Sequence, residues 1–198
     1  MRPSRRDLQA VSGFDVNNGK KSVAAFVGMG SNLGDRLGML RFAVAALDVA
    51  EGVAVEKVSS VYEAEAHVLP DQDPQPDHLN AVIWMSTTRT TEDLLGLLQH
   101  IEREAGRNAS APQWSQRPLD LDLLLFGAEA FESEKLTIPH PKLAERRFVL
   151  LPLADLVHNL AVPGADGATV SDLLGRCPDT KRVKRSRLRL VDDPQPDL

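Results

Sequence analysis

The sequence of 198 residues contains a single cysteine, Cys177. One cysteine excludes an internal disulfide and fits no metal-binding spacing, so we expect a reducing compartment, the cytoplasm. No apolar run approaches the ~18 residues that span a bilayer. The bases near the start are followed by a polar stretch instead of an apolar signal core, so we expect an unexported protein with no membrane partner.

Aromatic residues are scarce, at 5%, and the 23 bases are outnumbered by 28 acids. Residues 181–190, the basic segment, hold six of these bases and no acid. Without the basic segment, 17 bases face 28 acids, a balance of −11. Because nucleic acid binding needs a basic face, we expect no nucleic-acid partner. A bound polyanion must be held by a few well-placed bases or by metal ions.

The composition, 42% hydrophobic and 26% charged, is typical of one globular domain. We expect this domain at residues 22–180, and we expect a monomer. Residues 1–21 have the composition of a disordered extension. Residues 181–198 form either an edge strand, kept from aggregating by its charges, or a loose tail.

Hydrophobic periodicity predicts a mixed fold. Helices are predicted at residues 37–47, behind Asp35, and at 90–106, from a Thr90 cap to a Gly106 stop. Short apolar or alternating runs predict four strands, at 22–28, 53–62, 80–87 and 119–126. The β-α-β-β-α-β order indicates an α+β fold of the ferredoxin-like type, an antiparallel sheet with two helices on one face. Peripheral helix at 150–157 and near 170 is expected to join the same core.

The sharpest chemical signal is the sequence W-S-Q-R-P-L-D-L-D at 114–122. Alternate residues of a strand share a face, so Asp120 and Asp122 present two carboxylates to one side. Paired carboxylates repel unless a cation lies between them, and magnesium completes its octahedron with water and phosphate oxygens. Arg117 adds a planar fork for phosphate. The alternative is the solvated face of an amphipathic strand.

A second cluster starts at His140, which lies between two prolines. Lys142, Arg146, Arg147 and Phe148 follow within eight residues, a pattern that indicates a phosphate-binding segment with a stacking ring. The alternative is a loop that leads into an amphipathic helix whose bases are merely exposed.

A glycine-rich stretch, G-M-G-S-N-L-G-D-R at 28–36, follows the first predicted strand. Leu33 occupies the place of the third glycine in the dinucleotide-binding motif, and no P-loop sequence occurs, so we exclude both. We expect these glycines to permit a tight turn and close packing instead.

These segments, in their order and register, resemble the 6-hydroxymethyl-7,8-dihydropterin pyrophosphokinase family of folate biosynthesis. The resemblance covers residues 22–160 and includes G-S-N-L-G-D-R, D-H-L-N at 77–80, W-x-x-R-x-L-D-L-D-x-x-L-F-G, I-P-H-P and R-x-F. It implies a ferredoxin-like fold and a transferase that moves a pyrophosphoryl group from ATP to the hydroxymethyl oxygen of the pterin, releasing AMP.

The resemblance also implies the residues of the site. Two magnesium ions are held by Asp120 and Asp122, and they bridge the ATP phosphates. Phosphates are bound by Arg107, Arg117, His140 and Arg146, which with the two aspartates form the catalytic set. The nucleotide side further includes Gln99, Glu102, Trp114, Leu123 and Thr137. The pterin side includes His78, Asn80, Trp114 and Phe148.

Four positions depart from the family pattern. Ala109 replaces a second arginine, Ser115 and Gln116 replace Gly-Pro, and His78 replaces the usual tyrosine or phenylalanine opposite Phe148. These departures leave open a relative that binds ATP or pterin without turnover. A nucleic-acid-binding module that uses the basic segment is disfavoured by the acidic body and by the lack of an aromatic RNA-binding motif.

Overall fold

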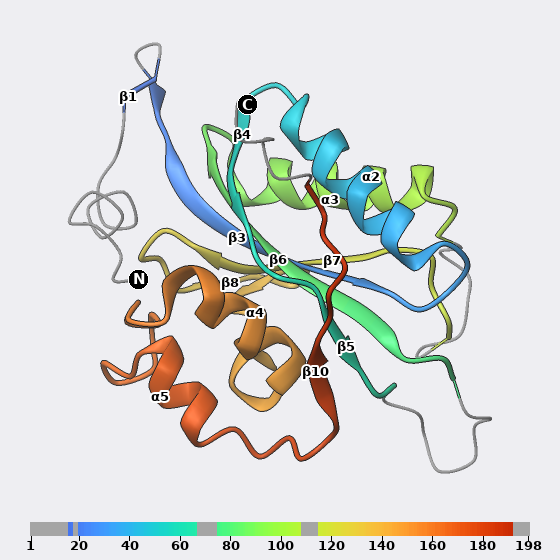
Figure 1. Cartoon of the computed structure of the whole chain (residues 1–198). Helices are drawn as coiled ribbons and strands as arrows, with labels where there is room; N and C mark the ends of the chain where they lie inside the picture. The colour runs from blue at the N-terminus through green and yellow to red at the C-terminus, as the bar shows by residue number, and fades with distance from the viewer. Residues whose placement is uncertain (1–15, 18–19, 67–74, 108–114, 192–198) are drawn as a thin grey trace, which may run out of the picture.

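The computed structural model describes residues 16–17, 20–66, 75–107 and 115–191, drawn as coloured ribbon in Figure 1. None of the helices in these ranges is long and apolar enough to cross a membrane. Most of the expected disordered extension at 1–21 lies outside the described residues. Within it, β1 (Val16–Asn17) and β2 (Lys20–Lys21) pair antiparallel.

The main sheet has six antiparallel strands, so the prediction of an antiparallel sheet with packed helices is confirmed. Its order is β10-β5-β6-β3-β7, and β4 also pairs with β6. A small ribbon, β8 (Phe131–Glu132) with β9 (Thr137–Ile138), lies outside it. The main strands are β3 (Val23–Ser31), β4 (Val53–Val58), β5 (Tyr62–Ala64), β6 (His78–Thr87), β7 (Asp120–Phe126) and β10 (Val183–Arg185).

Helices cover both faces of this sheet (Figure 1). One core joins the sheet to α2 (Arg36–Asp48) and α3 (Thr91–Glu104), and a second core joins it to α4 (Arg147–Val157) and α5 (Val170–Gly175). The prediction that the C-terminal helices join the same core is therefore wrong. Consecutive buried residues in β3, β6 and β7 account for the second core, because strands covered on both faces are apolar on both.

Side-chain caps place the two helices of the first core. The Gly38 amide donates to Asp35 Oδ1 at 2.9 Å, and the Asp93 amide donates to Thr90 Oγ1 at 3.1 Å. These bonds satisfy amides that have no partner within the helix. Gly106, at φ 87°, lies just beyond the end of α3. The Thr90 cap and the Gly106 stop are those that the sequence predicts, whereas Asp35, expected in the first turn, is the cap of α2.

The strand predicted at 53–62 is instead two strands, β4 and β5, separated at residues 59–61. The Ser59 hydroxyl accepts a hydrogen bond from the Val82 amide at 2.9 Å, while the Ser59 amide donates to the Val82 carbonyl. A side chain here replaces one backbone partner of the ladder, and such local competition interrupts a strand.

Beyond this break, Tyr62 ties β5 to α4. Its hydroxyl donates to Asp155 Oδ1 at 3.0 Å, and the Ser60 amide donates to Asp155 Oδ2 at 3.2 Å. Burial, followed by the neighbouring Asp155 carboxylate, raises the pKa of Tyr62 to about 12.

Tyr62 is the only tyrosine, so its ionisation can be followed by ultraviolet absorbance. We expect tyrosinate to form near pH 12 instead of near 10, and Asp155→Asn to lower this midpoint. The raised pKa stabilises the fold below pH 10, and this stabilisation is lost as pH rises towards 12. A smooth titration near pH 10 with intact circular dichroism would contradict the tie.

Candidate active site

A cavity of about 370 Å³ opens where β3, β5, β6 and β7 meet the segment that leads into α4. Its floor contains Gly28 and Gly30, which lie inside β3. A Cβ on Gly30 would lie 3.4 Å from Asn80 Oδ1, and one on Gly28 would lie 3.4 Å from Leu124. The predicted tight turn at these two glycines is therefore wrong. They keep the floor clear, and the turn comes later, with Gly34 at φ 67°.

Asp120 and Asp122 both face this cavity from β7, as the strand periodicity predicts. The alternating side chains of the same strand, Leu121 and Leu123, belong to the core on the other face. Burial, and then the charge of Asp120, raises the pKa of the Asp122 carboxyl. The two carboxylates thus favour a cation between them or basic groups beside them.

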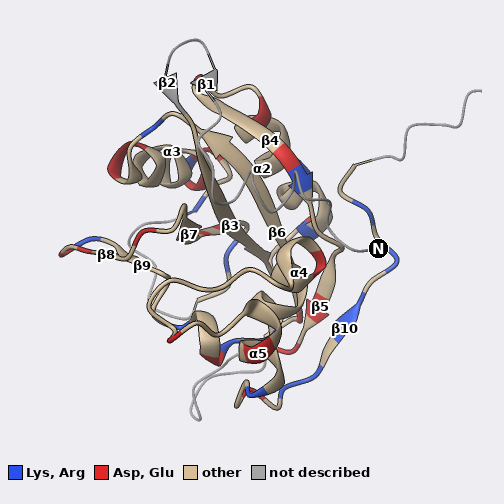
Figure 2. Cartoon of the chain, turned by 90° about the vertical axis from the view of Figure 1, so that its left-hand side faces the viewer, with Lys and Arg blue, Asp and Glu red and all other residues tan. Residues whose placement is uncertain are grey.

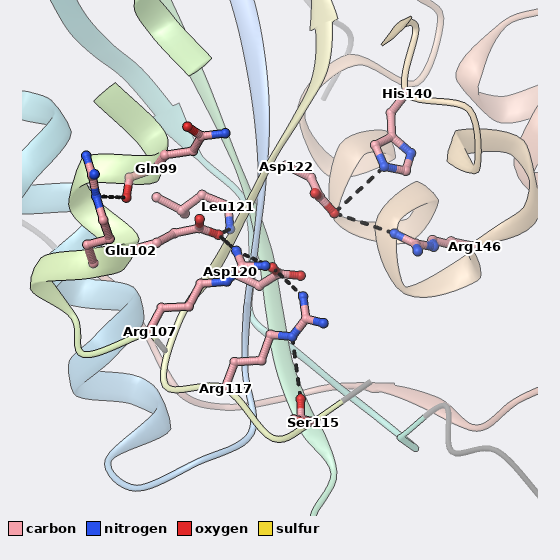
Figure 3. Close-up of polar contacts among 11 residues, drawn as sticks. Gln99, Glu102, Arg107, Ser115, Arg117, Asp120, Leu121, Asp122, His140 and Arg146 are labelled. Carbon is pink, nitrogen blue, oxygen red and sulfur yellow. Dashed lines mark hydrogen bonds and ion pairs between the residues drawn. The ribbon is translucent and has the colours of Figure 1, made fainter. Parts of the chain in front are cut away.

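Basic groups contact each carboxylate separately (Figure 3). Asp120 Oδ1 lies 2.9 Å from Arg107 Nη1 and 2.8 Å from Arg117 Nη1. Asp122 Oδ2 lies 3.5 Å from Arg146 Nη1 and 3.9 Å from His140 Nε2. Three arginines and a histidine from distant parts of the chain therefore surround two adjacent carboxylates.

Backbone contacts orient His140. The His140 amide donates to the Leu124 carbonyl at 2.9 Å, and the Lys142 amide donates to His140 Nδ1 at 3.1 Å. With Nδ1 accepting, the proton of the neutral ring lies on Nε2, the nitrogen that faces Asp122. Burial lowers the pKa of His140, although the Asp122 charge acts in the opposite direction.

Glu102 is a buried anchor at one side of the site. Its Oε1 accepts a hydrogen bond from the Leu121 amide at 2.8 Å and pairs with Arg107 Nη1. Burial is the largest influence on its pKa, which is raised. Glu102 thus ties α3 to β7 and holds Arg107 beside Asp120. It does not line the cavity, where the sequence places it as a nucleotide contact.

The same cavity is lined by three residues predicted for a flat ligand: His78, Asn80 and Phe148. Asn80 is buried, and its Nδ2 donates to the His78 carbonyl at 3.4 Å. The Arg146 guanidinium lies 5.7 Å from the centre of the Phe148 ring, within range of a cation–π contact. Arg146 therefore contacts both a carboxylate of the site, Asp122, and the Phe148 ring.

The remaining predicted residues lie elsewhere. Gln99 is exposed on α3, and Thr137 lies in β9. Neither lines the cavity, and the Leu123 side chain packs in the core, so only its backbone could reach a ligand. Trp114 lies outside the described residues.

Sequence reasoning missed Asn32, a buried residue that links two walls of the site. Its Oδ1 accepts from the Arg117 amide at 2.8 Å, and its Nδ2 donates to Gln75 Oε1 at 3.1 Å. Gln75, Glu65 and Ser115 line the cavity and were also missed. The only signal in the sequence was a polar amide directly after a buried strand.

The donor set fits a metal that arrives with phosphate. Within the described ranges, no group of three or more His, Cys, Asp or Glu side chains is arranged to hold a metal ion. Magnesium takes one or two carboxylates and fills its other positions with water and phosphate oxygens. Asp120 and Asp122, with bases placed for phosphate, match that pattern.

Comparisons with known proteins agree on one family. Residues 26–158 match the model of the 7,8-dihydro-6-hydroxymethylpterin-pyrophosphokinase (HPPK) family. The chain is 44% identical over 132 residues to 2-amino-4-hydroxy-6-hydroxymethyldihydropteridine pyrophosphokinase of Bacillus subtilis, covering 67% of this chain and 77% of that one. The enzyme of that name from Haemophilus influenzae is 35% identical over 82% of this chain and 98% of its own.

Among solved structures, the chain is similar to HPPK-DHPS of Plasmodium falciparum, crystallised with pterin and p-hydroxybenzoate. The TM-score is 0.59 at 13% sequence identity, over 84% of this chain and 44% of that chain. At this identity the likeness shows a shared fold. The chain spans less than half of that longer protein.

Proposed function

The chain belongs to the 7,8-dihydro-6-hydroxymethylpterin-pyrophosphokinase family, whose members transfer a pyrophosphoryl group from ATP to hydroxymethyldihydropterin in folate biosynthesis, and from this premise we propose which residues do the work. Its activity is that of an ATP-dependent pterin pyrophosphokinase. The observation that carries the assignment of residues is that one cavity is lined by Asp120 and Asp122, with basic groups beside them, and also by Asn80 and Phe148.

The ATP phosphates bind where the basic groups surround Asp120 and Asp122. Arg117 and Arg146, whose guanidinium groups already contact Asp120 and Asp122, bind phosphate oxygens, and Arg107 and His140 assist them. Asp120 and Asp122 would hold two magnesium ions, which would supply positive charge to neutralise the triphosphate. Arg107, Arg117 and Arg146, which pair with these carboxylates here, would then be able to contact phosphate oxygens.

The pterin binds beside Asn80 and Phe148. Phe148 supplies a face for stacking, and the amide of Asn80 supplies a donor and an acceptor for the pterin edge. His78 forms part of the opposing wall. The glycine floor leaves the room that a flat ring system needs, because no side chain projects from Gly28 or Gly30.

With both ligands in this cavity, the hydroxymethyl oxygen attacks the β-phosphorus of ATP. One oxygen–phosphorus bond forms, the bond between the β-phosphorus and the α,β-bridging oxygen breaks, and AMP leaves with that oxygen. The hydroxyl proton is lost to solvent. Such a transfer depends on alignment and on neutralising negative charge, which the bases here provide.

We further propose a ferredoxin-like topology in a single domain at 22–180, acting as a monomer in the cytoplasm. Four of the six main strands, with two helices, follow the order β3-α2-β4-β6-α3-β7 along the chain. In the sheet these strands are ordered β4-β6-β3-β7, which supports the topology.

The assignment of Asn80 to the pterin predicts that Asn80→Ala weakens pterin binding selectively. We expect the KM for pterin to rise about tenfold, the cost of one buried hydrogen bond to a ligand, with little change in the KM for ATP. AMP formation with magnesium, ATP and 6-hydroxymethyl-7,8-dihydropterin is the measurement. The control is Asn159→Ala, which removes an exposed amide from the turn that follows α4.

An equal rise in both KM values would contradict the assignment of Asn80 to pterin. Calorimetric binding of both ligands by the unmodified chain without AMP formation would contradict turnover itself. That result is the one expected of a relative that only binds.

A further inference from the structure

One wall of the cavity is built from two chain segments that the sequence does not place together. Ala64 and Glu65 line it at the end of β5, and Gln75 and His78 line it at the start of β6. The strands pair here, Ala64 with His78. What fixes this wall therefore fixes the side of the cavity next to Asn80, which pairs with Tyr62 in the same ladder.

Two residues at the start of the basic segment contact both sides of this wall. Lys181 Nζ donates to the Ala66 carbonyl at 3.0 Å. Arg182 Nη2 donates to Asp77 Oδ2 at 2.7 Å, and the Arg182 carbonyl accepts from the Glu65 amide at 3.1 Å. We name Lys181 and Arg182 the tail clamp.

The tail clamp is itself held in place. The next residue, Val183, pairs with Ala64 in the β10–β5 ladder, and the Lys181 amide donates to Asp179 Oδ1 at 3.0 Å. Figure 2 shows blue basic residues along β10 beside red on β5. Backbone hydrogen bonds therefore hold the basic segment at the edge of the sheet, and the side chains of the tail clamp contact the wall.

Asp77 is gripped from two sides. While Arg182 contacts its carboxylate, Arg36 Nη1 donates to its carbonyl at 2.6 Å. The same Arg36 nitrogen pairs with Glu63 Oε1 at 2.9 Å. Asp77 immediately precedes His78, so these contacts restrain the backbone from which the His78 ring projects.

We propose that Lys181 and Arg182 are positioning residues for the pterin, which act by holding the wall of Glu65, Gln75 and His78 at its distance from Phe148. The inference rests on the proposed function, because it assigns that wall to pterin. It goes beyond the family assignment, since residues 181–182 lie outside the segment 26–158 that matches the family model.

The exposure of the pair separates positioning from stability. The Arg182 and Asp77 side chains are 51% and 27% exposed, and such surface ion pairs contribute little to global stability. A small displacement of a wall that contacts a ligand, in contrast, weakens binding directly. Loss of the tail clamp should therefore raise the Kd for pterin without lowering the unfolding midpoint.

The test compares Arg182→Gln with Arg187→Gln, which removes an exposed arginine five residues further along the same segment. We expect Arg182→Gln to raise the Kd for 6-hydroxymethyl-7,8-dihydropterin about three- to tenfold by calorimetry. The Kd for a non-hydrolysable ATP analogue with magnesium and the unfolding midpoint should stay close to those of the unmodified chain. Arg187→Gln should change none of the three.

Asp77→Asn completes a double-mutant cycle. Arg182 and Asp77 are the two partners of one contact. The Kd of the double variant for pterin should therefore be no higher than that of whichever single variant has the higher Kd. An unchanged pterin Kd in Arg182→Gln, or equal weakening of pterin and ATP analogue together with a lower unfolding midpoint, would overturn the positioning role. Failure of the unmodified chain to bind pterin at this cavity, with no effect of Asn80→Ala, would instead overturn the proposed function.

Discussion

Replacing both Asp120 and Asp122 by asparagine is expected to lower the rate of AMP formation at least about a thousandfold, while the chain stays folded. Each charged group that stabilises a transition state contributes about 10²–10³ in rate, and this substitution removes both anionic ligands from the cavity. The bases around the site would remain without the cations that complement the triphosphate. The measurement is AMP formation at saturating ATP and magnesium, beside Glu134→Gln, which removes an exposed carboxylate elsewhere.

The stability of the fold, unlike the activity, should not fall when Asp122 is replaced. Burial and the neighbouring Asp120 raise the pKa of Asp122, so its ionised form opposes folding above its ordinary pKa. Asp122→Asn removes that charge, and we expect an equal or higher unfolding midpoint at neutral pH in the absence of ligands. Full activity in the double variant would refute the magnesium assignment, and a collapse of the fold would show that the aspartates are structural.

The largest effect on stability is expected from Glu102→Ala, which should lower the free energy of unfolding by about 2 to 3 kcal/mol. The variant leaves the Leu121 amide without its acceptor in a buried strand and leaves a gap where the side chain packs. Arg107 also loses one of its two carboxylate partners. Urea unfolding, read by circular dichroism, measures the difference.

Glu102→Gln is the matched control, because the amide oxygen can still accept from Leu121. We expect it to cost less than about 1 kcal/mol. Since the pKa of Glu102 is raised, its contribution favours folding most at low pH and is lost as pH rises through the raised pKa. The slope of stability against pH above about 4.5 should therefore flatten in the glutamine variant. Equal losses in both variants would contradict the role of the Leu121 hydrogen bond.

Local patterns in the sequence predict the parts of this molecule that depend on neighbours along the chain. The caps at Asp35 and Thr90 mark helix starts because they satisfy nearby amides. Asp120 and Asp122 share a face because strand periodicity is local. Apolar residues on both faces of β3 could also have revealed the second core, but a short apolar run alone does not say how many layers cover it.

Contacts between distant segments are what the sequence does not reveal. The sequence predicts Glu102 as a nucleotide contact, and only its contact with Leu121 of β7 shows it to be an anchor. Asn32 and Gln75 are separated by 43 positions and Asp77 and Arg182 by 105. A single sequence gives no signal of such pairs, because nothing in either residue identifies its partner.

The placement of β3 divides the molecule by its resistance to local opening. β3 is hydrogen-bonded along its length to β6 on one side and through most of it to β7 on the other, whereas β10 is a three-residue strand at the edge. Interior strands open only with global unfolding, while edges open at small free-energy cost. The floor of the cavity therefore persists through the fluctuations that free a wall, so ligands can enter and leave over a surface that never has to be rebuilt.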